Sequence, residues 1–184
     1  MLLIHNGIYM EDKNGELLPK FFFNPELGPA DEEFDTEDQG MKGYNLRSEP
    51  FYNRLLQNPN IGEVFRSIDL EDISTPIFYA NPGDPVTYKL LMPAEKPRAT
   101  SFYLHEHAYQ SESENINSPI IGARGAITIG GTYKSEMLAG ATAGIGQPGD
   151  YMYQSANIRW DIEEGMWGIM HVDREDEIVV PLKD

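Results

Sequence analysis

Thr100-Ser-Phe-Tyr-Leu-His-Glu-His107 is one of two stretches that decide the fold. The other is Gly149-Asp-Tyr-Met-Tyr-Gln-Ser-Ala-Asn-Ile-Arg-Trp160, which leads on to Gly165-Met-Trp-Gly168. Aromatic and β-branched residues favour strands, and glycines bound them. We therefore expect strands at Thr100 to Tyr109, Tyr151 to Ser155 and Met166 to Val172, with Asn157 to Glu164 as a connection of one or two helical turns.

Further strands are expected at the spacing of a β-sandwich or barrel. They cover Leu2 to Tyr9, Ile77 to Ala80, Val86 to Met92, Ala126 to Ile129 and Thr132 to Leu138. Every second residue from Val86 to Met92 is apolar or aromatic, which suits one wall of a sandwich. The Gly130-Gly131 pair predicts a hairpin turn. The predicted fold class is all-β, a Greek-key β-sandwich.

The amino-terminal part is expected to form a strand pair and a long acidic loop. Lys20 to Phe23 is a candidate return strand for the first strand, and Asn24 to Arg47 is predicted to be an irregular loop that contains the acidic run Asp31 to Asp38. A short helix is expected at Glu49 to Gln57. We therefore predict two parts: residues 1–76 pack on the sandwich, and residues 77–184 form it.

The charge balance narrows the choice of partners. Thirty acidic residues against 14 basic ones give a formal net charge of −16, which repels phosphate backbones and anionic lipid headgroups. The apolar run Met1 to Ile4 is far shorter than the roughly 20 residues that a spanning helix needs, and no signal peptide is evident. We expect no nucleic acid and no membrane as partners.

The chain contains no cysteine, so a disulfide, a Cys nucleophile and a thiolate metal site are excluded. The metal-ligand candidates are His105 and His107. In a continuous strand, Tyr103, His105 and His107 would stand in a row on one face. Imidazoles at that spacing can hold copper or zinc, although a stable site needs three or four ligands. The alternative is a polar row that is hydrogen-bonded to its neighbours.

The segment from about Asn81 to Val172 resembles the last cupredoxin domain of multicopper oxidases. Phe34 to Arg47 and Arg47-Ser-Glu-Pro50 are similar to the preceding loop in large bacterial members, including those associated with manganese oxidation. The first family motif is His-Pro-x-His-Leu-His-Gly-His, which aligns with Thr100 to His107. The second is His-Cys-His, followed four residues later by another His and then by Gly-Met.

The resemblance places copper ligands at positions where this chain has other residues. The family's mononuclear-copper His falls on Thr100, and its two cluster His residues fall on Tyr103 and His105, of which only His105 keeps an imidazole; His107 matches a family His that is not usually a ligand. The His-Cys-His motif falls on Gln154, Ser155 and Ala156, with Trp160 at the later His and Met166 at or one residue past the axial Met. A serine hydroxyl is a hard donor that cannot replace a thiolate.

The resemblance therefore implies a cupredoxin-like fold with degenerate copper positions. The function that we expect is a copper-free structural or interaction module, derived from a multicopper oxidase, that packs against a protein partner or another copy of itself. No cofactor is expected, and the chain alone is not expected to be catalytic. The alternative is a chain that contributes to a multicopper oxidase assembly, with His105 as a residual cluster ligand and copper as cofactor.

Overall fold

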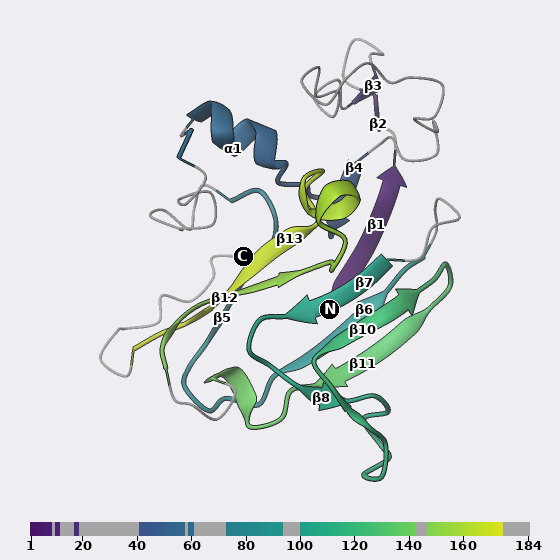
Figure 1. The fold of residues 1–184 in the computed structure, drawn as a ribbon, viewed down its shortest axis with the longest axis vertical. Coiled ribbons are helices and arrows are strands. Elements are labelled where there is room, and N and C mark those ends of the chain that lie inside the picture. Colours follow the sequence, from purple (N-terminus) through teal and green to yellow (C-terminus); the bar gives the residue numbers. More distant parts are fainter. Residues whose placement is uncertain are drawn as a thin grey trace.

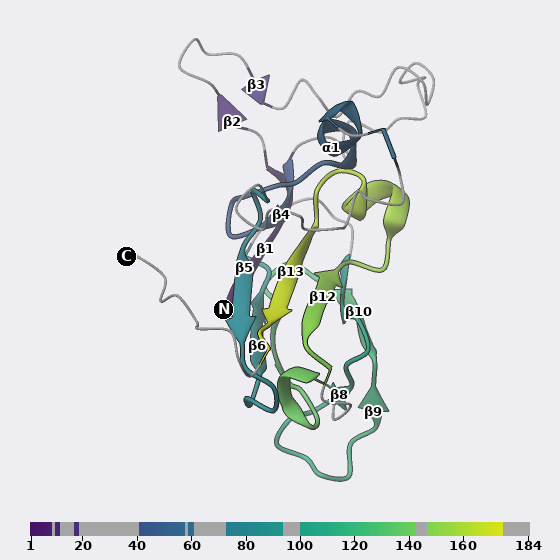
Figure 2. The same ribbon diagram turned by 90° about the vertical axis from the view of Figure 1, so that its left-hand side faces the viewer.

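The computed structural model of the 184-residue chain describes residues 1–8, 10–11, 17–18, 41–57, 59–60, 73–93, 100–142 and 147–174. Most regular structure in these ranges is β-strand, in two main sheets that face one another (Figures 1 and 2). The described helical elements are short: α1 (Phe51–Gln57), a 3₁₀ turn at Gly140–Thr142 and a π-helical turn at Ile158–Ile162. The prediction of an all-β sandwich is confirmed.

The first sheet has the strand order β11-β6-β1-β4. Its strands are β1 (Leu2–Ile8), β4 (Met41–Tyr44), β6 (Thr87–Leu91) and β11 (Thr132–Glu136). β1 runs parallel to β6, with Leu2 opposite Leu90, and antiparallel to β4, with Ile4 opposite Tyr44. The amino-terminal strand is therefore an interior strand of the sandwich.

The second sheet has the strand order β10-β7-β12-β13-β5. Its strands are β5 (Ile77–Ala80), β7 (Thr100–Leu104), β10 (Ala123–Ile127), β12 (Gly149–Gln154) and β13 (Trp167–Val172). β12 and β13 pair antiparallel along their whole length, and β5 runs parallel to β13. Two small ribbons pair β2 (Met10–Glu11) with β3 (Leu17–Leu18), and β8 (Tyr109–Gln110) with β9 (Ile120–Ile121).

The main core lies between the two sheets. In β6, Tyr88 and Leu90 are buried while Lys89 is exposed, as the period-two pattern predicts. They pack with Phe102 and Leu104 of β7 in one cluster that draws on both sheets. Burying a Leu or Phe side chain contributes about 1.5–3 kcal/mol relative to leaving it exposed, so the alternation fixes which face of each strand turns inward.

A second, smaller apolar cluster covers the outer face of the second sheet. Met152 of β12 and Trp167 and Ile169 of β13 point to this face. Ile162 of the π-helical turn and the half-buried Phe51 of α1 pack over them. The two central strands are thus buried on both faces, which explains their nearly continuous apolar sequence.

Two predicted elements differ in the structure. The strand expected at Thr100 to Tyr109 ends at Leu104, because Glu106 adopts a left-handed backbone conformation (φ 62°) and the His107 amide hydrogen-bonds to the Leu104 carbonyl (3.1 Å). Gly130-Gly131 makes a tight turn but no hairpin: β10 pairs with β7 and β11 with β6, so the turn joins the two sheets.

The amino-terminal expectations have mixed outcomes. Met41–Tyr44 forms β4, whereas we expected it to lie in an irregular loop. Lys20 to Phe23 and the acidic run Asp31 to Asp38 fall outside the described residues. The division into residues 1–76 and 77–184 stays a prediction, although β1 and β4 belong to the first sheet itself. Within the described ranges, no helix has the length and apolar character needed to cross a lipid bilayer.

Candidate functional site

Strand pairing brings three predicted positions together at one end of the second sheet. Thr100 is the first residue of β7, Ser155 directly follows β12 and Met166 directly precedes β13. The Thr100 Oγ1 lies 3.2 Å from the Ser155 Oγ and 3.4 Å from the Met166 Sδ. All three residues are buried. The structure therefore assembles the positions at which the resemblance places the mononuclear copper.

The π-helical turn supplies a fourth group that sequence reasoning missed. The Asp161 Oδ2 accepts hydrogen bonds from the Ser155 hydroxyl (2.5 Å) and from the Thr100 hydroxyl (2.7 Å). The resemblance had pointed to Trp160, whose side chain lies outside the described part. A π-turn places more residues in each turn than an α-turn does, so spacing alone did not show which residue faces inward.

A buried lysine from the other sheet completes the group. The Lys42 Nζ, on β4, lies 3.8 Å from the Asp161 Oδ1 and 3.1 Å from the Glu164 Oε2. The side chains of Lys42 and Asp161 are only 2% and 4% exposed. We call Lys42, Thr100, Ser155, Asp161 and Met166 the buried polar cluster.

The donor atoms of the buried polar cluster do not fit copper. They are two hydroxyls, a carboxylate and a thioether, without the imidazole or thiolate that copper prefers. The hydroxyls and the carboxylate are already engaged with one another, and the Ser155 Oγ also accepts from the Asn157 amide (3.2 Å). A lysine ammonium beside the carboxylate repels a second cation.

A second set of predicted positions meets on the outer face of the same sheet. Tyr103 of β7 and Gln154 of β12 are paired across the two strands. The Tyr103 ring centroid lies 4.7 Å from that of His105. Burial is the main cause that lowers the pKa of His105 below 6.5, although Gln154 and Glu106 act in the opposite direction. Ala156, at the last position of the His-Cys-His motif, is exposed and offers no side-chain donor atom.

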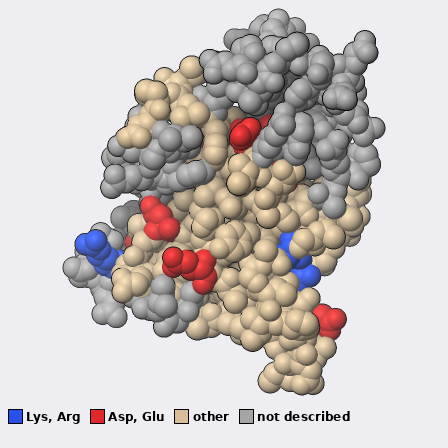
Figure 3. All heavy atoms as spheres, in the orientation of Figure 1, with Lys and Arg blue, Asp and Glu red and all other residues tan. Residues whose placement is uncertain are grey.

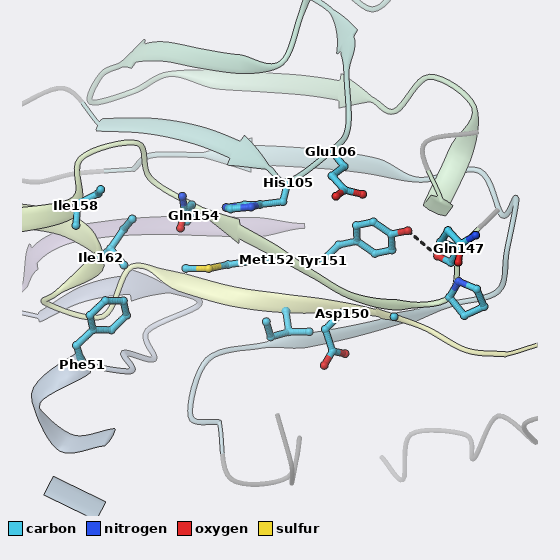
Figure 4. Close-up of a pocket in the computed structure, with 13 residues that line it drawn as sticks. Phe51, His105, Glu106, Gln147, Asp150, Tyr151, Met152, Gln154, Ile158 and Ile162 are labelled. Carbon is cyan, nitrogen blue, oxygen red and sulfur yellow. Dashed lines mark hydrogen bonds between the residues drawn. The ribbon is translucent and has the colours of Figure 1, made fainter. Parts of the chain in front are cut away.

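The His105 imidazole stands against the Gln154 side chain. Its Nε2 is buried, and a side-chain hydrogen bond with Gln154 raises the pKa against the effect of burial. Figure 4 shows the imidazole beside Gln154, over the strand that carries Met152. Because burial lowers the pKa, the imidazole is neutral near pH 7. It can therefore donate or accept a hydrogen bond, according to its tautomer.

His107 does not share this face, and the predicted row of Tyr103, His105 and His107 is wrong. The left-handed turn at Glu106 rotates His107 into the interior, where it is 2% exposed. Its Nδ1 lies 2.7 Å from the His105 carbonyl oxygen and its Nε2 lies 2.9 Å from the Ala141 carbonyl oxygen. Both nitrogens thus face the backbone, and metal binding by His107 stays a prediction.

The remaining histidines lie elsewhere. The His5 Nε2 is 3.1 Å from the Arg47 carbonyl oxygen. The His171 Nδ1 is 2.6 Å from the Asp150 Oδ1, and its Nε2 is 3.3 Å from the Asp173 Oδ1. Across the described ranges, no group of three or more His, Asp or Glu side chains is arranged to hold a metal ion.

A groove of about 610 Å³ opens on the outer face of the second sheet (Figure 4). Phe51, Ile158 and Ile162 line one end, while Glu106 and Asp150 line the other. His105, Gln154 and Met152 lie between these ends. At the acidic end, the Tyr151 hydroxyl donates to the Gln147 carbonyl oxygen (2.6 Å). The groove is therefore apolar at one end and polar at the other.

Fold and site together define a β-sandwich of two mixed sheets with a buried polar cluster and an outer groove. No protein-family model and no curated protein sequence matches the chain. Among solved structures, copper nitrite reductase from Nitrosomonas europaea matches with 15% identity and a TM-score of 0.47, over 98% of this chain and 43% of that chain. A multicopper oxidase matches with 15% identity and a TM-score of 0.44, over 54% of this chain and 35% of that chain. The chain thus spans less than half the length of either protein.

Proposed function

We propose that this chain is a copper-free cupredoxin-like module, derived from an ancestor of the multicopper oxidase type, that serves a structural or interaction role. One observation carries the proposal: Asp161, two hydroxyls and Lys42 fill the space where the resemblance places the mononuclear copper. A redox centre needs soft or imidazole ligands there. The chain has no cysteine that could supply one.

Charge compensation gives the proposal its physical basis. Removing a carboxylate from water is costly unless a cation or several hydrogen bonds compensate it. Asp161 has both, because Lys42 approaches one carboxylate oxygen and two hydroxyls donate to the other. A copper ion entering this space would have to displace those hydrogen bonds and approach an ammonium group. The arrangement therefore favours a core without metal.

The expected partner is another protein or a second copy of the chain. With a formal net charge of −16, nucleic acid and anionic lipid are unfavourable partners. Figure 3 shows Lys and Arg at only a few places over the described part of the face in view, with no basic patch. Size-exclusion chromatography with light scattering measures the molar mass of the chain in solution and so distinguishes a second copy from another protein as the partner.

The second candidate is a contribution to an oxidase assembled from several chains. The observation that favours it is the His105 imidazole, the one retained cluster ligand of the resemblance, which lies on the outer face of the second sheet beside Tyr103 and Gln154. One imidazole cannot hold a copper cluster, so a partner chain would have to supply the other ligands. This candidate predicts copper uptake only in the presence of that partner.

Equilibrium dialysis against copper, followed by metal analysis, tests the proposal. We expect the wild-type chain to retain less than stoichiometric copper, and His105→Ala to retain as little. One tightly held copper ion per chain that is lost in Asp161→Asn or Thr100→Val would contradict the proposal. Uptake that requires a partner chain and is abolished by His105→Ala would instead support the second candidate.

A further inference from the structure

We propose that the outer groove binds a small organic cation with an apolar body, of the arylalkylamine or alkylamine class. The ammonium group would lie toward Glu106 and Asp150, and the apolar body toward Phe51, Ile158 and Ile162 (Figure 4). This site lies on the outer face of the second sheet. The buried polar cluster is a separate feature of the molecule, and the inference does not depend on whether copper binds there.

The apolar end offers contact surface for a hydrophobic group. Ile158 is 63% exposed, and Phe51 is half-buried against the Trp167 ring, with 6.0 Å between ring centroids. Met152 and Ile169 form the floor between the two central strands. A ligand that covers the exposed isoleucine and the concave apolar floor beside it would bury apolar surface, which favours binding.

The acidic end selects the sign of the ligand charge. Glu106 is exposed. Burial is the main cause that raises the pKa of Tyr151, and the Glu106 carboxylate raises it further; the same carboxylate partly offsets the effect of burial on the pKa of His105. Asp150 adds a carboxylate that is shared with His171. Of the described residues that line the groove, none is Lys or Arg. An anion would therefore meet only negative charge at this end.

His105 and Gln154 supply polar groups between the two ends. Both line the groove, and a side-chain hydrogen bond joins them. An imidazole and an amide can each hydrogen-bond to an ammonium N–H. The volume of about 610 Å³ falls within the range of sites for small ligands.

Three probes of similar shape test the charge selection: 2-phenylethylamine, the neutral 2-phenylethanol and the anionic 3-phenylpropionate. We expect saturable NMR shift changes with the amine at residues of the groove, weaker changes with the alcohol and none with the carboxylate. Equal binding of the amine and the carboxylate would overturn the proposal. So would amine binding that never saturates or that maps to other surfaces.

Matched variants test the location. Ile158→Lys places a positive charge at the apolar end and is expected to remove saturable amine binding. Ile116→Lys makes the same change at an 86% exposed residue outside the groove and is expected to preserve that binding.

A second pair of variants tests the acidic end. Glu106→Gln should weaken the affinity for the amine about two- to fivefold, as for an exposed ion pair, and leave the affinity for the alcohol unchanged. Glu112→Gln, an acidic residue away from the groove, controls for the general negative field. Equal effects of the two members of either pair would contradict the proposed location of the site.

Discussion

At the scale of single residues, Lys42 and Asp161 are the charged pair of the buried polar cluster. Each is almost fully buried, and neither was predicted as a site residue. The sequence did indicate Thr100, Ser155 and Met166, because the resemblance assigned roles to those positions. It could not indicate Lys42, since the lysine comes from a segment expected to be a loop, nor Asp161, because a π-turn changes which residue faces inward.

The first residue-scale prediction concerns this ion pair. Lys42→Met leaves the Asp161 and Glu164 carboxylates without their buried cation and is expected to destabilise the fold by about 3–5 kcal/mol. The double variant Lys42→Met with Asp161→Asn should be less destabilised than the sum of the two single variants. Urea unfolding measures the free energy of unfolding of all three variants. Lys134→Met removes an exposed lysine, 41% accessible, that pairs with Glu136, and should change stability by less than about 0.5 kcal/mol.

The outcome that contradicts this account is additivity. If the two single changes simply add, then Lys42 and Asp161 do not compensate one another in the folded chain. A loss in Lys42→Met no larger than that in Lys134→Met would lead to the same conclusion.

The second residue-scale prediction concerns pH and His105. Burial lowers the pKa of its imidazole below the ordinary 6.5, so between the folded and unfolded pKa values the unfolded chain binds a proton that the folded chain does not. The stability from this residue is therefore present above pH 6.5 and is lost as the pH falls through the folded pKa. Urea unfolding from pH 7 to 5 should show a smaller decline in His105→Gln than in wild type. An NMR titration that places the pKa of His105 above 6.5 would disprove it.

At the scale of elements, the strands were easier to predict than their pairing. Ile77–Ala80 and the buried alternation of β6 are as the sequence predicted, because side-chain periodicity is a local signal. The Gly130-Gly131 turn was read as a hairpin, yet β10 and β11 find their partners in different sheets. Partner choice depends on residues far along the chain, which a turn motif does not contain. The end of β7 was missed for a related reason, since Glu106 gives no local sign of a left-handed conformation.

The prediction at this scale concerns Gly168 of β13, against which the Tyr153 ring of β12 packs. A Cβ at Gly168 would overlap the Tyr153 hydroxyl oxygen, whose proton is donated to the Pro76 carbonyl. Gly168→Ala should therefore destabilise the protein by about 1–3 kcal/mol or more, as overpacking does. Gly125→Ala, where a Cβ meets nothing within 4 Å, should change stability by less than about 0.5 kcal/mol. Equal stability of the two variants in urea unfolding would show that the Tyr153 ring does not pack tightly against Gly168.

At the scale of the whole molecule, packed apolar side chains and a buried ion pair stabilise the sandwich. Two apolar clusters cover both faces of the second sheet, and both sheets contribute to the main one. The buried polar cluster lies at the end of this sheet, where β7, β12 and β13 meet and a lysine arrives from the first sheet. The resemblance predicted the architecture. The groove was not predicted, because Phe51 of α1 and His105 and Glu106 after β7 come from segments far in sequence from β12 and the π-helical turn.

The central claim is that an ion pair and two hydroxyls replace copper in this fold. Electron paramagnetic resonance of the chain with one equivalent of Cu²⁺ tests it most directly, beside a variant that restores ligands through Thr100→His, Ser155→Cys and Asp161→His. We predict a specific copper signal and an intense visible absorption band for the variant, and neither for the wild-type chain. A stoichiometric copper signal in the wild-type chain that Thr100→Val or Asp161→Asn abolishes would contradict the account.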